Sequence, residues 1–77
     1  MVDLTKARQL KLLDMVAVLN SSGAPDVHAG DVGTVVELLP PDGLEVEFLS
    51  RDGRTRHIGT LSSGDVLVLN RERTRVA

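Results

Sequence analysis

Two histidines are the residues of this chain best suited to metal or acid–base chemistry. His28 lies between Asp26 and Asp31, so one short segment offers carboxylate oxygens and an imidazole nitrogen. No second histidine is near it in the sequence, and the spacing is not that of an EF-hand calcium loop. We therefore expect no metal here, and we expect both carboxylates to accept hydrogen bonds within the turns around them.

His57 is the second candidate, and it lies next to Arg56 in a segment of β character. A general base needs a nucleophile within reach, and the chain has no Gly-x-Ser-x-Gly nucleophile motif. It also has no cysteine, which excludes thiol nucleophiles, disulfides and Cys-ligated metals. We predict that the protein is not an enzyme, with no catalytic residue, no cofactor-binding residue, no cofactor and no metal.

The segment Gly30-Asp31-Val32-Gly33 has the form of a Gly-x-x-Gly loop. Phosphate-binding loops of this kind lead into a helix, whereas β-branched residues follow this one, and Asp31 would repel a phosphate. We interpret Gly30 as a loop residue with positive φ. We interpret Gly33 as a position where the chain bulges or where two strands approach closely.

Charge is distributed unevenly along the 77 residues. The net charge is −2, yet residues 14–50 contain seven carboxylates and neither lysine nor arginine. An acidic block of this kind repels nucleic-acid phosphates and favours a basic partner. The alternative is that these carboxylates only solvate the outer faces of strands.

Five short segments rich in β-branched and other apolar residues predict five strands, at 14–19, 30–39, 44–49, 55–61 and 66–69. Turns are expected at 40–43 and 51–54, with one turn of 3₁₀ helix near 62–65. We predict an all-β fold, a small SH3-like barrel of about five antiparallel strands. The expected core consists of Met15, Val18, Val35, Val46, Phe48, Ile58, Leu61 and Leu67.

The length leaves room for one domain. We expect a flexible N-terminal segment at 1–12, the SH3-like barrel at 13–70 and a basic C-terminal tail at 71–77. No apolar run approaches the roughly 20 residues of a membrane-spanning helix, and the N-terminus lacks the apolar core of a signal peptide. We therefore expect a cytoplasmic protein without membrane association.

Four segments, in this order along the chain, carry a family resemblance: residues 13–19, 30–37, 45–48 and 52–55. The second of them begins with the run Gly30-Asp31-Val32-Gly33-Thr34-Val35. Together they resemble the bacterial family of small proteins known as domain of unknown function 4926, over about residues 12 to 69. The second segment is also similar to KOW-type and other SH3-like barrels. The resemblance implies an SH3-like barrel, and it brings no activity, catalytic residue or cofactor.

These features favour a non-enzymatic protein-interaction module that binds a partner protein through the 20–29 loop and strand edges. A groove for proline-rich peptides is not expected, because such grooves are lined by aromatic residues and the chain has neither Trp nor Tyr. The expected contact residues are Asp26, Val27, His28, Asp31, Leu49, Arg54 and Arg56.

Two alternatives remain open, together with self-association. One is a nucleic-acid or ribosome-associated KOW-like barrel, which the arginines at 51–56 and 71–75 would serve, although the acidic balance makes nucleic acid the less favoured partner. The other is an accessory or regulatory subunit of a larger complex, including an antitoxin-like partner. Surface leucines and the acidic middle of the chain between basic ends also predict pairing as a homodimer.

Overall fold

The computed structural model describes residues 10–50 and 52–69. The predicted tail at 71–77, the predicted flexible segment as far as residue 9, and Arg51 lie outside the described residues. The strands are β1 (Met15–Val18), β2 (Val32–Leu39), β3 (Gly43–Leu49), β4 (Arg56–Ser62) and β5 (Val66–Val68), with the 3₁₀ turn η1 (Ser63–Asp65) between the last two. The predicted all-β fold is confirmed, and each predicted strand lies within two residues of its observed bounds.

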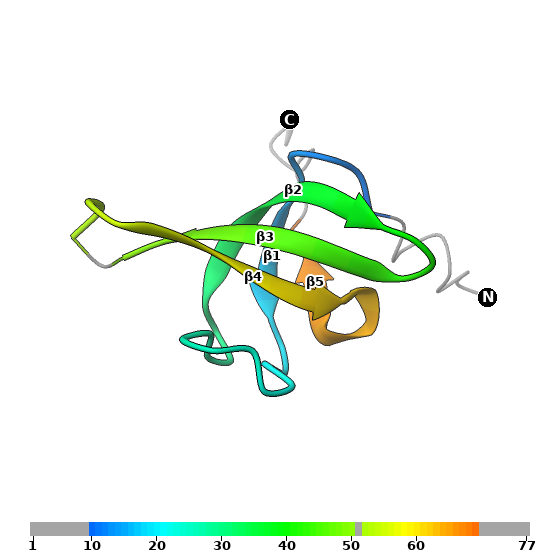
Figure 1. Ribbon diagram of the computed structural model, residues 1–77, viewed down its shortest axis with the longest axis horizontal. Helices are drawn as coiled ribbons and strands as arrows, with labels where there is room; N and C mark the ends of the chain where they lie inside the picture. Colours follow the sequence, from blue (N-terminus) through cyan, green and yellow to red (C-terminus); the bar gives the residue numbers. More distant parts are fainter. Residues whose placement is uncertain (1–9, 51, 70–77) are drawn as a thin grey trace, which may run out of the picture.

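All five strands belong to one antiparallel sheet with the order β4-β3-β2-β1-β5. The first four strands follow one another as neighbours, and the last returns to pair with the first. A register shift between Val35 and Glu37 marks an irregularity in β2. Figure 1 shows β3 and β4 crossing in front of β1 and β5, so that one face of the sheet is turned inward.

The inward face carries the core, to which every strand contributes. The third strand shows why, since Leu44, Val46 and Phe48 alternate with Glu45 and Glu47 and only the apolar set is buried. Of the predicted core, five residues are confirmed as buried: Val18, Val35, Val46, Phe48 and Leu61.

Three predicted core residues are wrong. Met15, Ile58 and Leu67 are 48%, 52% and 53% exposed, because each lies one position away from the residue that points inward. Successive side chains of a strand point to opposite faces, so an error of one residue moves a side chain from the core to the surface. The inward positions next to the three are occupied by Val16, Gly59 and Val66.

Two glycines, one within β2 and one just before it, have distinct structural roles. A Cβ atom at Gly33 would lie 2.6 Å from Cγ1 of Val46 and 2.7 Å from the Glu47 carbonyl oxygen. The predicted close strand approach at this position is therefore confirmed. Gly30, expected to have positive φ, has a φ of 96°, so it makes the turn that leads into β2.

Candidate interaction surface

A polar pocket lies where the loop between β1 and β2 meets the base of the β3–β4 hairpin. Its volume is about 220 Å³. Three of the predicted contact residues, Asp26, Asp31 and Leu49, line this pocket although they come from separate parts of the chain. We call it the Asp26 pocket; its remaining lining residues are Val32, Phe48, Ser50 and His57.

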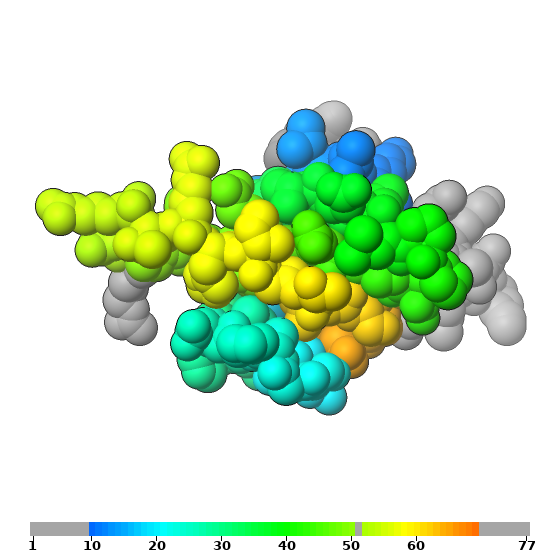
Figure 2. All heavy atoms as spheres, in the orientation of Figure 1, coloured from blue at the N-terminus to red at the C-terminus, as the bar shows by residue number. Residues whose placement is uncertain are grey.

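Val27 holds the loop in place. Its side chain is only 3% exposed and belongs to the core. A Cβ atom at Gly59 of β4 would lie 2.9 Å from Cγ2 of Val27, so the loop packs against the strand at a position where only glycine fits. Figure 2 shows this loop, in cyan, lying directly against β4, in yellow. Val27 is therefore a core anchor, and its expected role as a partner contact is corrected.

Asp31 stabilises the turn that closes the loop. Its Oδ2 accepts a hydrogen bond of 2.9 Å from the backbone N–H of His28, and its own N–H donates to the His28 carbonyl oxygen at 3.0 Å. Nδ1 of His28 lies 3.9 Å from the same carboxylate, but the His28 side chain is 80% exposed. An exposed pair of this kind contributes little to stability, and His28 does not line the Asp26 pocket.

His57 forms part of the wall of the Asp26 pocket. It is paired with Phe48 across β3 and β4, and the two rings stack with centroids 5.3 Å apart and planes 26° apart. Its Nε2 atom is buried, and among the described residues it has no hydrogen-bond partner. His57 was not among the predicted contact residues, although it lies two and four residues before Gly59 and Leu61, a spacing that places all three on the inward face.

Ser50 and His57 line the same pocket as two aspartates, which raises the question of a catalytic triad. The Ser50 hydroxyl donates to Asp52, and Ser50 Oγ accepts a hydrogen bond of 3.1 Å from the backbone N–H of Thr55. Because His57 Nε2 has no partner within the described chain, no hydrogen bond from Ser50 reaches it. A triad requires that bond, so this arrangement is not one.

The Ser50 hydroxyl instead stabilises the hairpin turn. Together with the Arg54 backbone N–H, which donates at 2.9 Å, it holds the pKa of Asp52 below its ordinary value; the hydroxyl has the larger effect. The backbone N–H of Gly53 donates to the Ser50 carbonyl oxygen at 2.8 Å, and Gly53 has a φ of 76°. The turn is therefore fixed by local hydrogen bonds.

Arg54 and Arg56, two further predicted contact residues, lie on this hairpin and not in the Asp26 pocket. Both are exposed, and Figure 1 shows the hairpin extending away from the rest of the sheet. Nη1 of Arg56 lies 3.6 Å from Oε2 of Glu47 in an exposed ion pair. The hairpin therefore presents cations that do not line the Asp26 pocket.

A row of apolar side chains crosses the outer face of the sheet and ends at the pocket. Ala17 is paired with Leu67 on one side and with Val32 on the other. The pairing of Gly33 with Phe48 places Leu49 next to Val32 one step further along the strands, and both line the Asp26 pocket. Apart from Ala17, these residues are about half exposed. We call this set the outer row: Leu67, Ala17, Val32 and Leu49.

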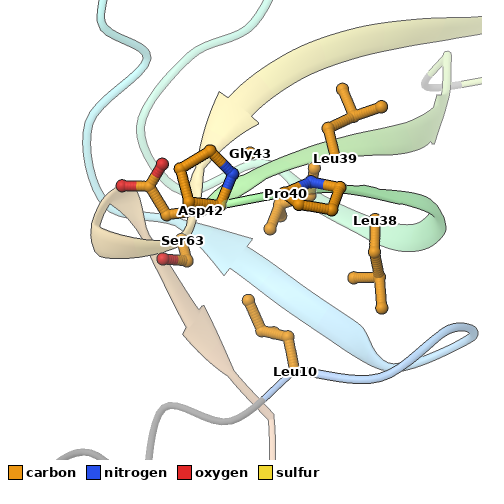
Figure 3. Close-up of a pocket in the computed structure, with 9 residues that line it drawn as sticks. Leu10, Leu38, Leu39, Pro40, Asp42, Gly43 and Ser63 are labelled. Atoms are coloured by element: carbon orange, nitrogen blue, oxygen red, sulfur yellow. The ribbon is translucent and has the colours of Figure 1, made fainter.

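A second hollow, of about 320 Å³, lies at the turn between β2 and β3, and it is mainly apolar (Figure 3). Leu10, from the segment before β1, and Leu38 face the same space, with Asp42 and Ser63 at one side. None of the predicted contact residues lines it. The sequence signal for it is the apolar run that enters the turn, Leu38-Leu39-Pro40-Pro41.

The described residues contain neither a cluster of metal-binding side chains nor a helix suited to spanning a membrane. Within residues 10–50 and 52–69, no three His, Cys, Asp or Glu side chains gather closely enough to hold a metal ion. The same part of the chain contains no helix whose length and apolar character would suit it to crossing a membrane.

Comparison with protein families identifies a match over most of the chain. A family model described as "Domain of unknown function (DUF4926)" matches residues 12–68, which confirms the resemblance found in the sequence and includes all five strands. No curated protein matches the chain, and no solved structure does.

Proposed function

The chain belongs to the DUF4926 family, whose description assigns no activity, and from its surface we propose a non-enzymatic protein-interaction module. It would bind a basic partner protein through the 20–29 loop, the Asp26 pocket and the outer row. The order of the strands, with η1 before a last strand that returns to β1, supports an SH3-like barrel as the scaffold. Such scaffolds carry function in their loops and strand ends.

The observation that carries the proposal is the outer row. Leu67, Val32 and Leu49 are exposed, and the register places them on one face as near neighbours across four strands. Complete burial of an exposed Val or Leu side chain is worth about 1.5–3 kcal/mol. Because these three are already about half buried, a partner that covers them would gain about half of that for each, which is a useful part of the free energy of a specific complex.

Charge indicates the chemistry of that partner. The described residues contain nine carboxylates and only three Lys or Arg side chains. Two of these carboxylates, Asp26 and Asp31, lie at the end of the outer row. A partner with a basic surface would be attracted to this end and oriented by it, whereas a nucleic-acid backbone would be repelled.

The strand edges could add main-chain hydrogen bonds to such a complex. The backbone N–H of Ser50 donates to the Thr55 carbonyl oxygen, and the N–H of Ser63 donates to the Asp42 carbonyl oxygen. Since hydrogen-bonded and non-hydrogen-bonded residue pairs alternate along antiparallel strands, these two bonds determine which pairs of β3 and β4 are hydrogen-bonded. By this alternation the backbone groups of Ile58 and Thr60 point away from β3. They are the groups that a strand from a partner or from a second copy would meet.

We expect polar substitution of the outer row to weaken binding of the partner by at least about tenfold. The variant replaces Val32, Leu49 and Leu67 with threonine, which places β-branched side chains on the strands and removes apolar contact area. Tagged wild-type and variant proteins are used to capture proteins from extracts of the native cells, and the captured proteins are quantified by mass spectrometry.

The matched control replaces Leu12 and Leu38, two exposed leucines outside the outer row, with threonine. The proposal requires one protein that the wild type and the control retain and that the outer-row variant loses. Capture of an untagged second copy of this chain, whose net charge is −2, in place of such a protein would show self-association and would contradict the proposed basic partner. Equal retention by all three proteins would refute the proposed surface.

A further inference from the structure

We propose that the Asp26 pocket receives one lysine or arginine side chain of the partner protein. This inference rests on the proposed function, because the side chain belongs to the proposed partner. The pocket would determine which residue of the partner is recognised. A module that selects a cation at one defined position would recognise a sequence in its partner, in addition to a basic surface.

The lining of the pocket suits the two parts of such a side chain. Val32, Leu49 and Phe48 offer apolar walls for an alkyl stem, and Asp26 and Asp31 offer carboxylates for the charged group. Lysine and arginine combine these parts, a hydrocarbon stem with a cation at its end. A purely apolar side chain would leave two carboxylates desolvated without compensation, which is costly.

The size of the pocket favours one side chain over a small-molecule ligand. Pockets that hold drug-sized ligands and cofactors have volumes of about 300–1,000 Å³, whereas this one has about 220 Å³. A metal ion is an equally small cation, but no three metal-binding side chains gather within the described residues.

Two observations within residues 10–50 and 52–69 indicate that this part of the chain does not supply a complement to the pocket. None of the described cations, Lys11, Arg54 and Arg56, lines it. In addition, the buried Nε2 atom of His57 has no hydrogen-bond partner in the described part of the chain. Buried polar atoms are normally hydrogen-bonded, and Nε2 of an imidazole protonated at Nδ1 is an acceptor. A lysine ammonium or an arginine guanidinium would supply hydrogen-bond donors to both carboxylates.

The test uses short capped peptides and does not require the natural partner. Capped Gly-Lys-Gly, Gly-Arg-Gly and Gly-norleucine-Gly peptides are titrated into the full-length ¹⁵N-labelled protein, and amide and imidazole chemical shifts are followed. Norleucine has the stem of lysine without its charge. We expect saturable shifts at Asp31, Ser50 and His57 with the lysine or arginine peptide, and none there with the norleucine peptide.

Two variants test the assignment to the carboxylates. Asp26→Asn with Asp31→Asn removes both charges, while the amide oxygen introduced at position 31 can still accept the bond from the His28 N–H. We expect binding at least about tenfold weaker, because bonds to charged groups are the stronger ones. Asp42→Asn, an exposed carboxylate outside the pocket, should leave binding unchanged. An unchanged spectrum in the rest of the sheet verifies that the double variant is folded.

Equal shifts with the norleucine peptide, equal binding by the double variant, or no shifts with either cationic peptide would overturn the pocket assignment. These results are independent of the capture experiment. Peptide binding without a captured partner would contradict the proposed function alone, and capture that depends on the outer row without peptide binding would contradict the pocket alone.

Discussion

Replacement of Phe48 with alanine is expected to unfold the protein at ordinary temperatures. Phe48 is the only aromatic residue of the chain other than the histidines, it is 2% exposed, and it lies beside Gly33, Gly59 and the ring of His57. Truncation of a buried Phe costs about 3–5 kcal/mol. A domain of this size has a free energy of unfolding near the lower end of the usual range, about 5 kcal/mol.

Circular dichroism and thermal unfolding measure this effect. The control is Leu49→Ala, which changes the next residue of the same strand, where the side chain is 57% exposed. For a domain of this length, 1 kcal/mol corresponds to a change in Tm of about 4–8 °C. If Phe48→Ala melted within a few degrees of the wild type, the placement of Phe48 at the centre of the core would be wrong.

Gly33→Ala is expected to have the second-largest effect on stability. The added Cβ would meet Cγ1 of Val46 and the carbonyl oxygen of Glu47 at distances well below van der Waals contact. Because one of these atoms belongs to the backbone of the paired strand, the clash is relieved only if β2 and β3 move apart. Overpacking of this kind costs about 1–3 kcal/mol, and occasionally more.

Gly64→Ala is the matched control for this substitution. Gly64 lies in η1 with no heavy atom within 4 Å of the added Cβ, and its φ is not positive. Alanine there should leave Tm unchanged or raise it slightly, because it restricts the unfolded chain. Equal losses for the two variants in chemical denaturation would show that the close approach at Gly33 is not the cause.

The amount of structure that could be predicted depended on the alternation within each strand. In β3 charged and apolar residues alternate, so the inward face could be assigned correctly. The segments Met15–Val18 and Val66–Val68 are apolar throughout, and their composition does not distinguish the two faces. Only the pairing of β1 with β2 and β5 decides that Val16 and Val66 point inward and that Met15 and Leu67 do not.

Glycine caused the remaining error in the core. Ile58 was the natural choice for an inward residue of β4, yet Gly59 occupies that position because Val27 and Phe48 fill the space where its side chain would be. Such a contact joins a loop and two strands that are far apart in the sequence. It depends on tertiary packing, and no local propensity reports it.

The candidate surface could be predicted in part for the same reason. The carboxylates Asp26 and Asp31 were identified from their place in a loop, and Leu49 from the alternation of β3, which leaves it outside the core. Val27 was expected among the contact residues of the 20–29 loop, but its burial follows from packing against Gly59 of β4, which is distant in the sequence. The outer row could not be foreseen, since it exists only through the register of four strands.

Photo-cross-linking from the outer row reports contact between the partner and a defined position, so it is the sharpest test of the proposed binding surface. A photoreactive amino acid is introduced separately at Leu49, at Leu67 and, as the control, at Leu38, all of which are exposed. If the outer row binds the partner, one protein in native-cell extract cross-links from positions 49 and 67 and not from position 38. Cross-linking of that protein from position 38 alone, or from all three positions equally, would contradict the proposed binding surface.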